Sequence, residues 1–259
     1  MKGEVVPIGI VPRWLVGEFV GTFLLVWFGC GSLCVAVAGG VGMGRFGVPL
    51  VWGLGVAAAI RLTAAWSGAH LNPAVTLSAA VWNGFPWRRV PGYWAAQLAG
   101  AMAASALLYL IFAGKLADFE TAQGIVRGLP GSEASARVFG EYFSIAEGAA
   151  FAVEVAGTAV LLLVIGGVSE GTGGRRPLLA AALIGLAVAV LIALLGPLTM
   201  ACFNPARDLG PRLVSSWAGW GGIPFRVNGW GWLTVYLIAP LLGALLGGGT
   251  YKGLKVFLR

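Results

Sequence analysis

The clearest chemical signal in the sequence is an Asn-Pro-Ala tripeptide that occurs twice, in a chain that contains only four asparagines. Asparagine is a favoured N-cap residue, and proline suits the first turn of a helix because its missing N–H would have no partner there. Apolar segments lie on both sides of each copy. Each tripeptide is therefore predicted to begin a helix. The residues are Asn72, Pro73 and Ala74 in the first copy and Asn204, Pro205 and Ala206 in the second.

Two helix starts of this kind would suit a neutral, oxygen-containing solute if they met. Each helix N-terminus carries roughly half an elementary positive charge, so the pair would repel cations. The side-chain amides of Asn72 and Asn204 would donate hydrogen bonds to water or to a hydroxyl group. Arg207 adds a full charge, and an arginine within a membrane usually lines an aqueous path or is paired. The alternative for Arg207 is that it only ties loops together.

The composition places this chain in a lipid bilayer. It has 259 residues, of which 58% are hydrophobic and 10% charged, and its mean hydropathy is +0.87. Long apolar runs without alternation predict an all-α polytopic membrane protein, because a membrane helix satisfies its own backbone groups. The net charge of +7 comes from short loops, where basic residues set topology, so nucleic acid is not an expected partner. The three cysteines lack metal-ligand spacing, and neither a metal nor a cofactor is expected.

Six apolar segments are long enough to be transmembrane helices, and two further helices are not. The six are expected at residues 14–38, 48–67, 90–114, 146–168, 177–195 and 231–251. The two Asn-Pro-Ala helices, at 72–82 and 204–217, are shorter. A helix as short as the first extends roughly 16 Å, about half of the hydrocarbon thickness. Both are therefore predicted to be re-entrant half-helices.

An internal repeat divides the chain into two halves. Glu-Phe-Val-Gly-Thr at 18–22 recurs as Glu-Val-Ala-Gly-Thr at 154–158. The halves are expected at approximately 1–114 and 146–259, joined by an extracellular loop, 115–145. Each half contains three spans, an odd number, so the second half must enter the membrane inverted. The half-helices would then approach from opposite faces, and their N-termini would meet near the midplane.

Both termini are expected to lie in the cytoplasm. An even number of spans puts the two ends of the chain on one side, and basic residues of the termini and connections, from Lys2 to Arg259, share that side. The positive-inside rule makes it the cytoplasmic one. The whole chain, 1–259, is expected to be a single membrane channel domain in the plasma membrane of a prokaryote.

The paired motifs carry a family resemblance. His-Leu-Asn-Pro-Ala-Val-Thr, from His70, together with Phe-Asn-Pro-Ala-Arg-Asp-Leu-Gly-Pro, from Phe203, resembles the major intrinsic protein family of aquaporins and glycerol facilitators. The resemblance extends over essentially the whole chain, including the Glu-x-x-Gly-Thr repeat and the order of the spans. It implies a homotetramer with one pore per subunit that conducts water or small neutral solutes passively and without proton leak. An enzyme is not expected, because no nucleophile, base and orienting partner converge in one motif of the sequence.

The resemblance places the selectivity filter at Trp52, Ile192, Ala201 and Arg207. Trp52, and Asp208 directly after the motif, are similar to glycerol facilitators, whereas a water-selective member usually has histidine at the position of Ile192. Glycerol facilitators usually have glycine there and an aromatic residue at the position of Ala201, so the sequence departs from both patterns. The four residues are similar to the filter of plant nodulin-type members. We expect an amphipathic opening in which Arg207 donates hydrogen bonds and Trp52 forms the opposite, apolar wall.

Four further residues are expected to support the half-helices. The resemblance implies that Glu18 and Glu154 accept hydrogen bonds from the backbone of the re-entrant loops, and that Asp208 has a supporting role. The alternative for the two glutamates is a proton relay, since carboxylates within a membrane are often functional. His70 either anchors its loop by hydrogen bonds or senses cytoplasmic pH, because an imidazole titrates near neutrality.

The sequence therefore predicts a passive channel for glycerol, water and other small neutral solutes that excludes protons and ions. A water-selective pore is the first alternative. A proton-coupled secondary transporter would share inverted repeats and buried carboxylates, but its uptake would saturate and depend on a gradient. A structural junction protein would show no solute flux.

Overall fold

Six long apolar helices dominate the structure, a computed structural model that describes residues 11–172 and 174–257. Each is long and apolar enough to cross a membrane, which confirms the predicted six spans. They are α1 (Arg13–Leu33) with η1 (Cys34–Ala38), α2 (Gly44–Ser67), η2 (Trp87–Arg89) with α4 (Val90–Ala122), α6 (Glu147–Thr172), α7 (Pro177–Thr199), and α10 (Gly231–Leu233) with η4 (Thr234–Ile238) and α11 (Ala239–Phe257).

Two short helices begin at the Asn-Pro-Ala motifs, as predicted. Helix α3 (Pro73–Trp82) packs against α11 and α4, and α8 (Pro205–Ser215) packs against α4. At ten residues, α3 is about 15 Å long, too short to cross a bilayer. The remaining short elements are α5 (Glu133–Ala136), η3 (Ser216–Trp220) and α9 (Ile223–Arg226).

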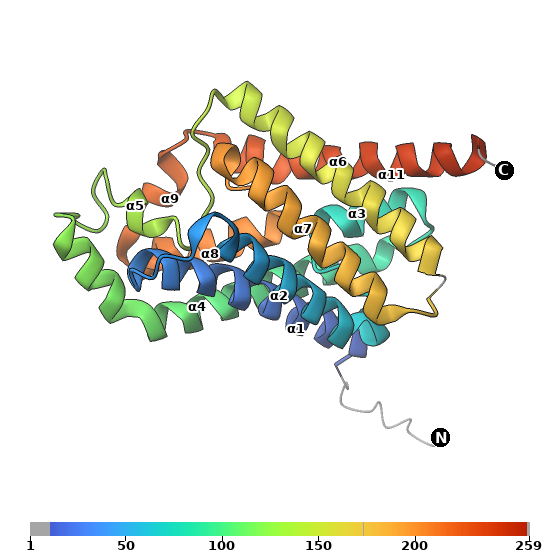
Figure 1. Cartoon of the computed structure of the whole chain (residues 1–259), viewed down its shortest axis with the longest axis horizontal. Helices are drawn as coiled ribbons and strands as arrows, with labels where there is room; N and C mark the ends of the chain where they lie inside the picture. Colours follow the sequence, from blue (N-terminus) through green and yellow to red (C-terminus); the bar gives the residue numbers. More distant parts are fainter. Residues whose placement is uncertain (1–10, 173, 258–259) are drawn as a thin grey trace, which may run out of the picture.

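The ends of the six long helices fall at two opposite ends of the molecule (Figure 1). Helix α1 begins and α11 ends at the end where α6 turns into α7, whereas α5 and α9 lie at the other end. Lys252 of α11 donates a hydrogen bond of 2.8 Å to the carbonyl of Trp82, the last residue of α3. The C-terminal end of α3 therefore lies near the end of α11, and a lysine there complements the helix dipole. Lys2 and Arg259, two of the expected topology determinants, lie outside the described residues.

The largest difference from the sequence prediction is the length of α4. The span was expected to end at Gly114, but the helix continues to Ala122, so the loop expected from Lys115 begins at Gln123. The extra turns contain leucine, alanine, lysine and glutamate, which favour helix. Their polar residues mark the end of the apolar run but do not break the helix. Glu120 in these turns forms an ion pair of 2.8 Å with Arg127, which anchors the loop that follows.

Glycine allows α2 and α7 to cross closely at the centre of the molecule. A Cβ atom at Gly53 would clash with the carbonyl oxygen of Gly185, and a Cβ atom at Gly185 would clash with that of Gly53. Small residues are the usual means by which membrane helices come this close. The two backbones are therefore in contact where side chains of any other type would separate them.

We expect Gly53→Leu to prevent correct folding, because the leucine would have to displace the α7 backbone, at a cost of about 3 kcal/mol or more. The yield of monodisperse, detergent-solubilised protein and its thermal unfolding would measure the effect. Gly148→Leu is the matched control, since a Cβ atom at Gly148 of α6 has no neighbour within 4 Å. Equal behaviour of the two variants would contradict this account of the crossing.

Candidate functional site

The two Asn-Pro-Ala motifs meet and are joined by their asparagines. Asn72 donates from Nδ2 to the carbonyl of Phe203 over 2.7 Å, and Asn204 donates from Nδ2 to the carbonyl of Leu71 over 2.8 Å. Both asparagines are N-caps, since Oδ1 of Asn72 accepts from the backbone N–H of Ala74, and Oδ1 of Asn204 accepts in the same way within its own motif. Each amide nitrogen carries two hydrogens, so one N–H of each remains for a solute.

The loops that lead into the half-helices have an unusual backbone. Leu71 and Phe203, directly before the two asparagines, have φ values of 53° and 51°. Residues other than glycine rarely occupy this left-handed region, so the surrounding structure must hold these loops in place. Their backbone N–H groups cannot pair within a helix and need other acceptors.

Two buried glutamates supply these acceptors. Glu18 accepts from the N–H groups of His70 and Leu71, over 3.0 and 2.7 Å. Glu154 accepts from the N–H groups of Cys202 and Phe203, over 3.0 and 2.8 Å. Both side chains are fully buried. These are the hydrogen bonds that the resemblance led us to expect of Glu18 and Glu154.

His70 is held within its own loop. Its Nδ1 lies 3.1 Å from Oγ1 of Thr76, and its ring packs against the rings of Phe85 and Tyr93. Gln97 donates both to Thr76, over 3.0 Å, and to Glu18, over 2.7 Å, so one hydrogen-bond network joins the imidazole to the carboxylate. This geometry is that of an anchoring residue.

A cavity of about 490 Å³ passes both asparagines. Residues at the junction of α6 and α7, such as Thr172 and Pro177, line one end, and Arg207 lines the other. Most of the remaining wall is apolar and comes from the spans, and it includes Leu25, Val56, Ile60, Leu161, Ile165 and Val188. The cavity therefore has a few hydrogen-bonding groups set in an apolar surface.

A second cavity of about 210 Å³ lies beyond Arg207. Five residues line both cavities and so surround the opening between them: Trp52, Glu141, Ile192, Met200 and Arg207. Three of these belong to the filter predicted from the sequence, whereas the fourth predicted residue, Ala201, lines only the larger cavity. Glu141 and Met200 were not predicted.

The guanidinium group of Arg207 is fixed on three sides. It donates from Nη1 to the carbonyl of Phe139 over 2.9 Å, and its Nη2 lies 2.5 Å from Oε1 of Glu141. Its Cζ lies 4.4 Å from the centre of the Trp52 ring. The expectation that Trp52 forms the wall opposite Arg207 is therefore wrong, since the two side chains are in contact. An arginine stacks favourably on an indole face, which explains the contact.

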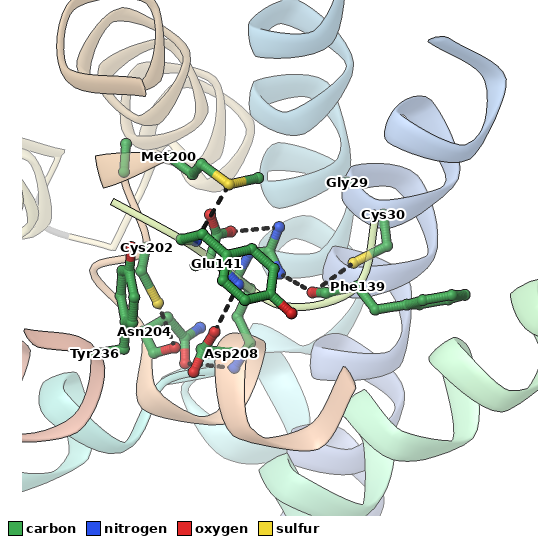
Figure 2. Close-up of polar contacts among 12 residues, drawn as sticks. Gly29, Cys30, Phe139, Glu141, Met200, Cys202, Asn204, Asp208 and Tyr236 are labelled. Atoms are coloured by element: carbon green, nitrogen blue, oxygen red, sulfur yellow. Dashed lines mark hydrogen bonds and ion pairs between the residues drawn. The ribbon is translucent and has the colours of Figure 1, made fainter. Parts of the chain in front are cut away.

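Asp208 joins α8 to the segment that carries Glu141. Its Oδ1 accepts from the backbone N–H of Glu141 over 2.8 Å, and both of its oxygens accept from Arg212. Arg212 also donates to the carbonyl of Glu141. Figure 2 shows Glu141 and Asp208 on opposite sides of this backbone segment, with Met200 near by. Asp208 therefore links α8 to the backbone at Glu141.

The two unpredicted residues gave little signal in the sequence. Glu141 lies in the loop between α4 and α6, and no periodicity or motif shows where a loop residue will point. The only indication was that Glu141 is an acidic residue followed by an aromatic one, close to the next apolar run. Met200 directly precedes the predicted Ala201, and its Sδ accepts from the N–H of Tyr142 over 3.3 Å.

The chain is similar to several known transport proteins. It is 44% identical over 241 residues to the glycerol uptake facilitator protein of Pseudomonas aeruginosa, covering 91% of this chain and 86% of that protein. It is 41% identical over 243 residues to the Escherichia coli protein of the same description, covering 92% and 86%. A propanediol uptake facilitator of Salmonella typhimurium is 38% identical over 246 residues, covering 91% and 90%.

A solved structure and a family model agree with these similarities. The X-ray structure of the aquaglyceroporin from Plasmodium falciparum matches with a TM-score of 0.82 and 29% identity, over 95% of this chain and 97% of that one. The family model described as major intrinsic protein matches residues 10–251. The chain therefore belongs to the major intrinsic protein family, in the branch of the glycerol facilitators and aquaglyceroporins.

Proposed function

We propose that this protein lets glycerol, propanediol, water and other small neutral solutes diffuse passively across the cell membrane. The observation that carries the proposal is the cavity that passes Asn72 and Asn204 and ends at Arg207. Hydrogen-bond donors on its wall can replace water around a hydroxyl group, and its apolar surface suits the C–H groups of a small polyol. The relatives are described as uptake facilitators of glycerol and of propanediol.

Selectivity for neutral solutes would come from the half-helices and from Arg207. The N-termini of α3 and α8 each present a partial positive charge to the cavity, which disfavours cations, including protons. The remaining N–H groups of Asn72 and Asn204 donate to a passing oxygen. The two asparagines cannot rotate away, because each also bonds to the loop of the other motif.

The two halves of the chain are proposed to be inverted copies that form one channel domain. Matching contacts support this: Tyr93 donates to the carbonyl of Ser67 over 2.6 Å, and Tyr236 donates to that of Thr199 over 3.0 Å. Each half also contributes three spans and one half-helix, and an odd number of spans inverts the second copy.

Family membership further supports a homotetramer with one pore per subunit and with both termini in the cytoplasm. The many large apolar residues exposed on the spans, such as Leu54, Leu110 and Leu194, would face lipid or neighbouring subunits in this arrangement. Native mass measurement in a mild detergent would test the subunit number, and protease accessibility in oriented vesicles would test the topology.

Vesicles offer a direct test of the proposed function. In hyperosmotic glycerol, proteoliposomes with this protein are expected to shrink and then re-swell much faster than empty vesicles. Stopped-flow light scattering measures both phases. Fast shrinking with unchanged re-swelling would instead identify a water-selective pore. Glycerol uptake against its own concentration gradient, driven by an imposed pH gradient, would identify a proton-coupled transporter.

Replacing Ile192 with glycine is expected to raise glycerol permeability by less than about tenfold, since removal of one apolar wall lowers a barrier by only about 1 kcal/mol. Ile192 lines the opening between the two cavities, so its loss should widen that opening. Leu194→Gly is the matched control. It puts the same residue into the same helix, α7, but at an exposed position outside the cavities. A similar effect of both variants would show that helix flexibility, and not the opening, controls the flux.

A further inference from the structure

Glu141 is an acidic side chain at the opening between the two cavities of a channel proposed for neutral solutes. It lines both cavities, yet only 1% of its side chain is exposed. One carboxylate oxygen, Oε1, lies 2.5 Å from Nη2 of Arg207. The other, Oε2, is buried and has no hydrogen-bond partner among the described residues. A buried carboxylate is costly to keep ionised when one of its oxygens has no hydrogen-bond partner.

The surroundings of Glu141 hold charges of both signs. Arg207 and Arg212 favour its ionised form, whereas Asp208 and Glu154 disfavour it. Burial has the largest effect, and it raises the pKa of Glu141 to about 8. The other titratable groups that interact with Glu141 or share its cavities are Cys30 of α1, His70 of the larger cavity, Tyr142 beside Glu141, Cys202 before α8, Tyr236 of η4, and Arg45 and Arg137 of the smaller cavity.

We propose that Glu141 is a positioning residue for Arg207, and that its protonation makes glycerol conduction depend on external pH. The ionised carboxylate pins Nη2 of Arg207 while the carbonyl of Phe139 holds Nη1, so the remaining N–H groups keep fixed directions. The pair also has no net charge. A passing hydroxyl group then meets donors that are oriented in advance.

Protonation removes the charge of Glu141 and leaves that of Arg207 uncompensated. The protonated carboxyl group can still accept a hydrogen bond, but the ion pair is lost. The full charge of the guanidinium then holds water and solute oxygens more tightly, which slows exchange at the opening. The direction of the pH dependence follows from the raised pKa of Glu141. Above about pH 8 the carboxylate is ionised and the pair is intact, whereas below it the proton is bound and the pair is broken. Glycerol permeability should therefore fall as the pH falls.

The test is the ratio of glycerol to water permeability of the same proteoliposomes at pH values from 9 to 6. For the wild-type protein we expect this ratio to fall by about threefold to tenfold, as expected for the loss of one hydrogen bond of ordinary strength. Glu141→Gln cannot titrate, and its ratio should stay flat at the acidic wild-type value. A flat wild-type profile would overturn the inference without any variant, and so would a pH dependence that persists in Glu141→Gln.

Glu120→Gln is the matched control, because Glu120, near the end of α4, is also a buried carboxylate paired with an arginine, Arg127. It lines neither cavity, and the variant should keep the wild-type profile. Loss of the profile in this control would contradict a specific role of Glu141. The inference rests on the proposed function, but the two fail differently. Absence of glycerol flux at every pH would reject the function, whereas flux that ignores pH would reject only the role of Glu141.

Discussion

Replacing Glu154 with alanine is expected to abolish glycerol flux and to destabilise the protein by about 2–6 kcal/mol, because two buried N–H groups would each lose an acceptor. These belong to Cys202 and Phe203, directly before the second motif. No helical hydrogen bond can replace the carboxylate, since Phe203 has a left-handed backbone with a φ of 51°. Asn204 would lose its fixed position, and with it one of the donors of the cavity. Thermal unfolding of the solubilised protein and stopped-flow glycerol flux would measure the two effects.

Two variants separate this effect from general damage to α6. Glu154→Gln keeps one acceptor oxygen and should lose about half as much stability as the alanine variant. Glu147→Ala removes an exposed glutamate from the first turn of the same helix and should leave the flux unchanged. If Glu154→Ala conducted glycerol as well as Glu147→Ala does, the carboxylate would not be the support of the half-helix.

Replacing Arg207 with alanine is the second change with a large expected effect. It leaves Glu141 buried without its partner, and breaking a buried pair in this way costs about 3–5 kcal/mol. The loss should be larger at pH 9 than at pH 6, because at pH 6 the unpaired Glu141 can take up a proton. The fixed positive charge at the opening also disappears, so the leak of small cations should rise above that of the wild-type protein. Unfolding at the two pH values and an ion-flux assay would measure these changes.

The double variant Arg207→Ala with Glu141→Gln tests the cause of the instability. Without a carboxylate there is no unpaired charge, so the double variant should be more stable at pH 9 than Arg207→Ala alone. Its cation leak should remain, since the fixed charge of Arg207 is still absent. A double variant as unstable as the single one would show that packing against Trp52, and not the charge of Glu141, makes Arg207 structurally important.

The sequence was a good guide to features that depend on short segments. Asn72 and Asn204 begin helices because an asparagine N-cap followed by proline favours a helix start wherever it occurs. The six spans follow from the length of the apolar runs. The prediction that the third span ends at Gly114 was wrong. Hydropathy indicates where a helix leaves the lipid, whereas the helix propensity of residues 115–122 extends α4 to Ala122.

The site was only partly predictable. Trp52, Ile192 and Arg207, which the family resemblance placed in the selectivity filter, surround the opening, and Glu18 and Glu154 accept hydrogen bonds from the loops. The contact between Arg207 and Trp52 was not foreseen, because Trp52 belongs to α2 and Arg207 to α8, and their separation depends on how those helices pack.

The sequence alone determined the class of the protein, because a backbone in lipid must make its hydrogen bonds internally and the apolar runs have the length of spanning helices. The two Asn-Pro-Ala motifs also determined where the half-helices begin. Only the tertiary structure decided which side chains contact Arg207. Glu141 reaches it from a loop whose path is set by Asp208, Arg212 and the helices around them. The position of such a residue is a property of packing between distant segments, which no local pattern in the sequence encodes.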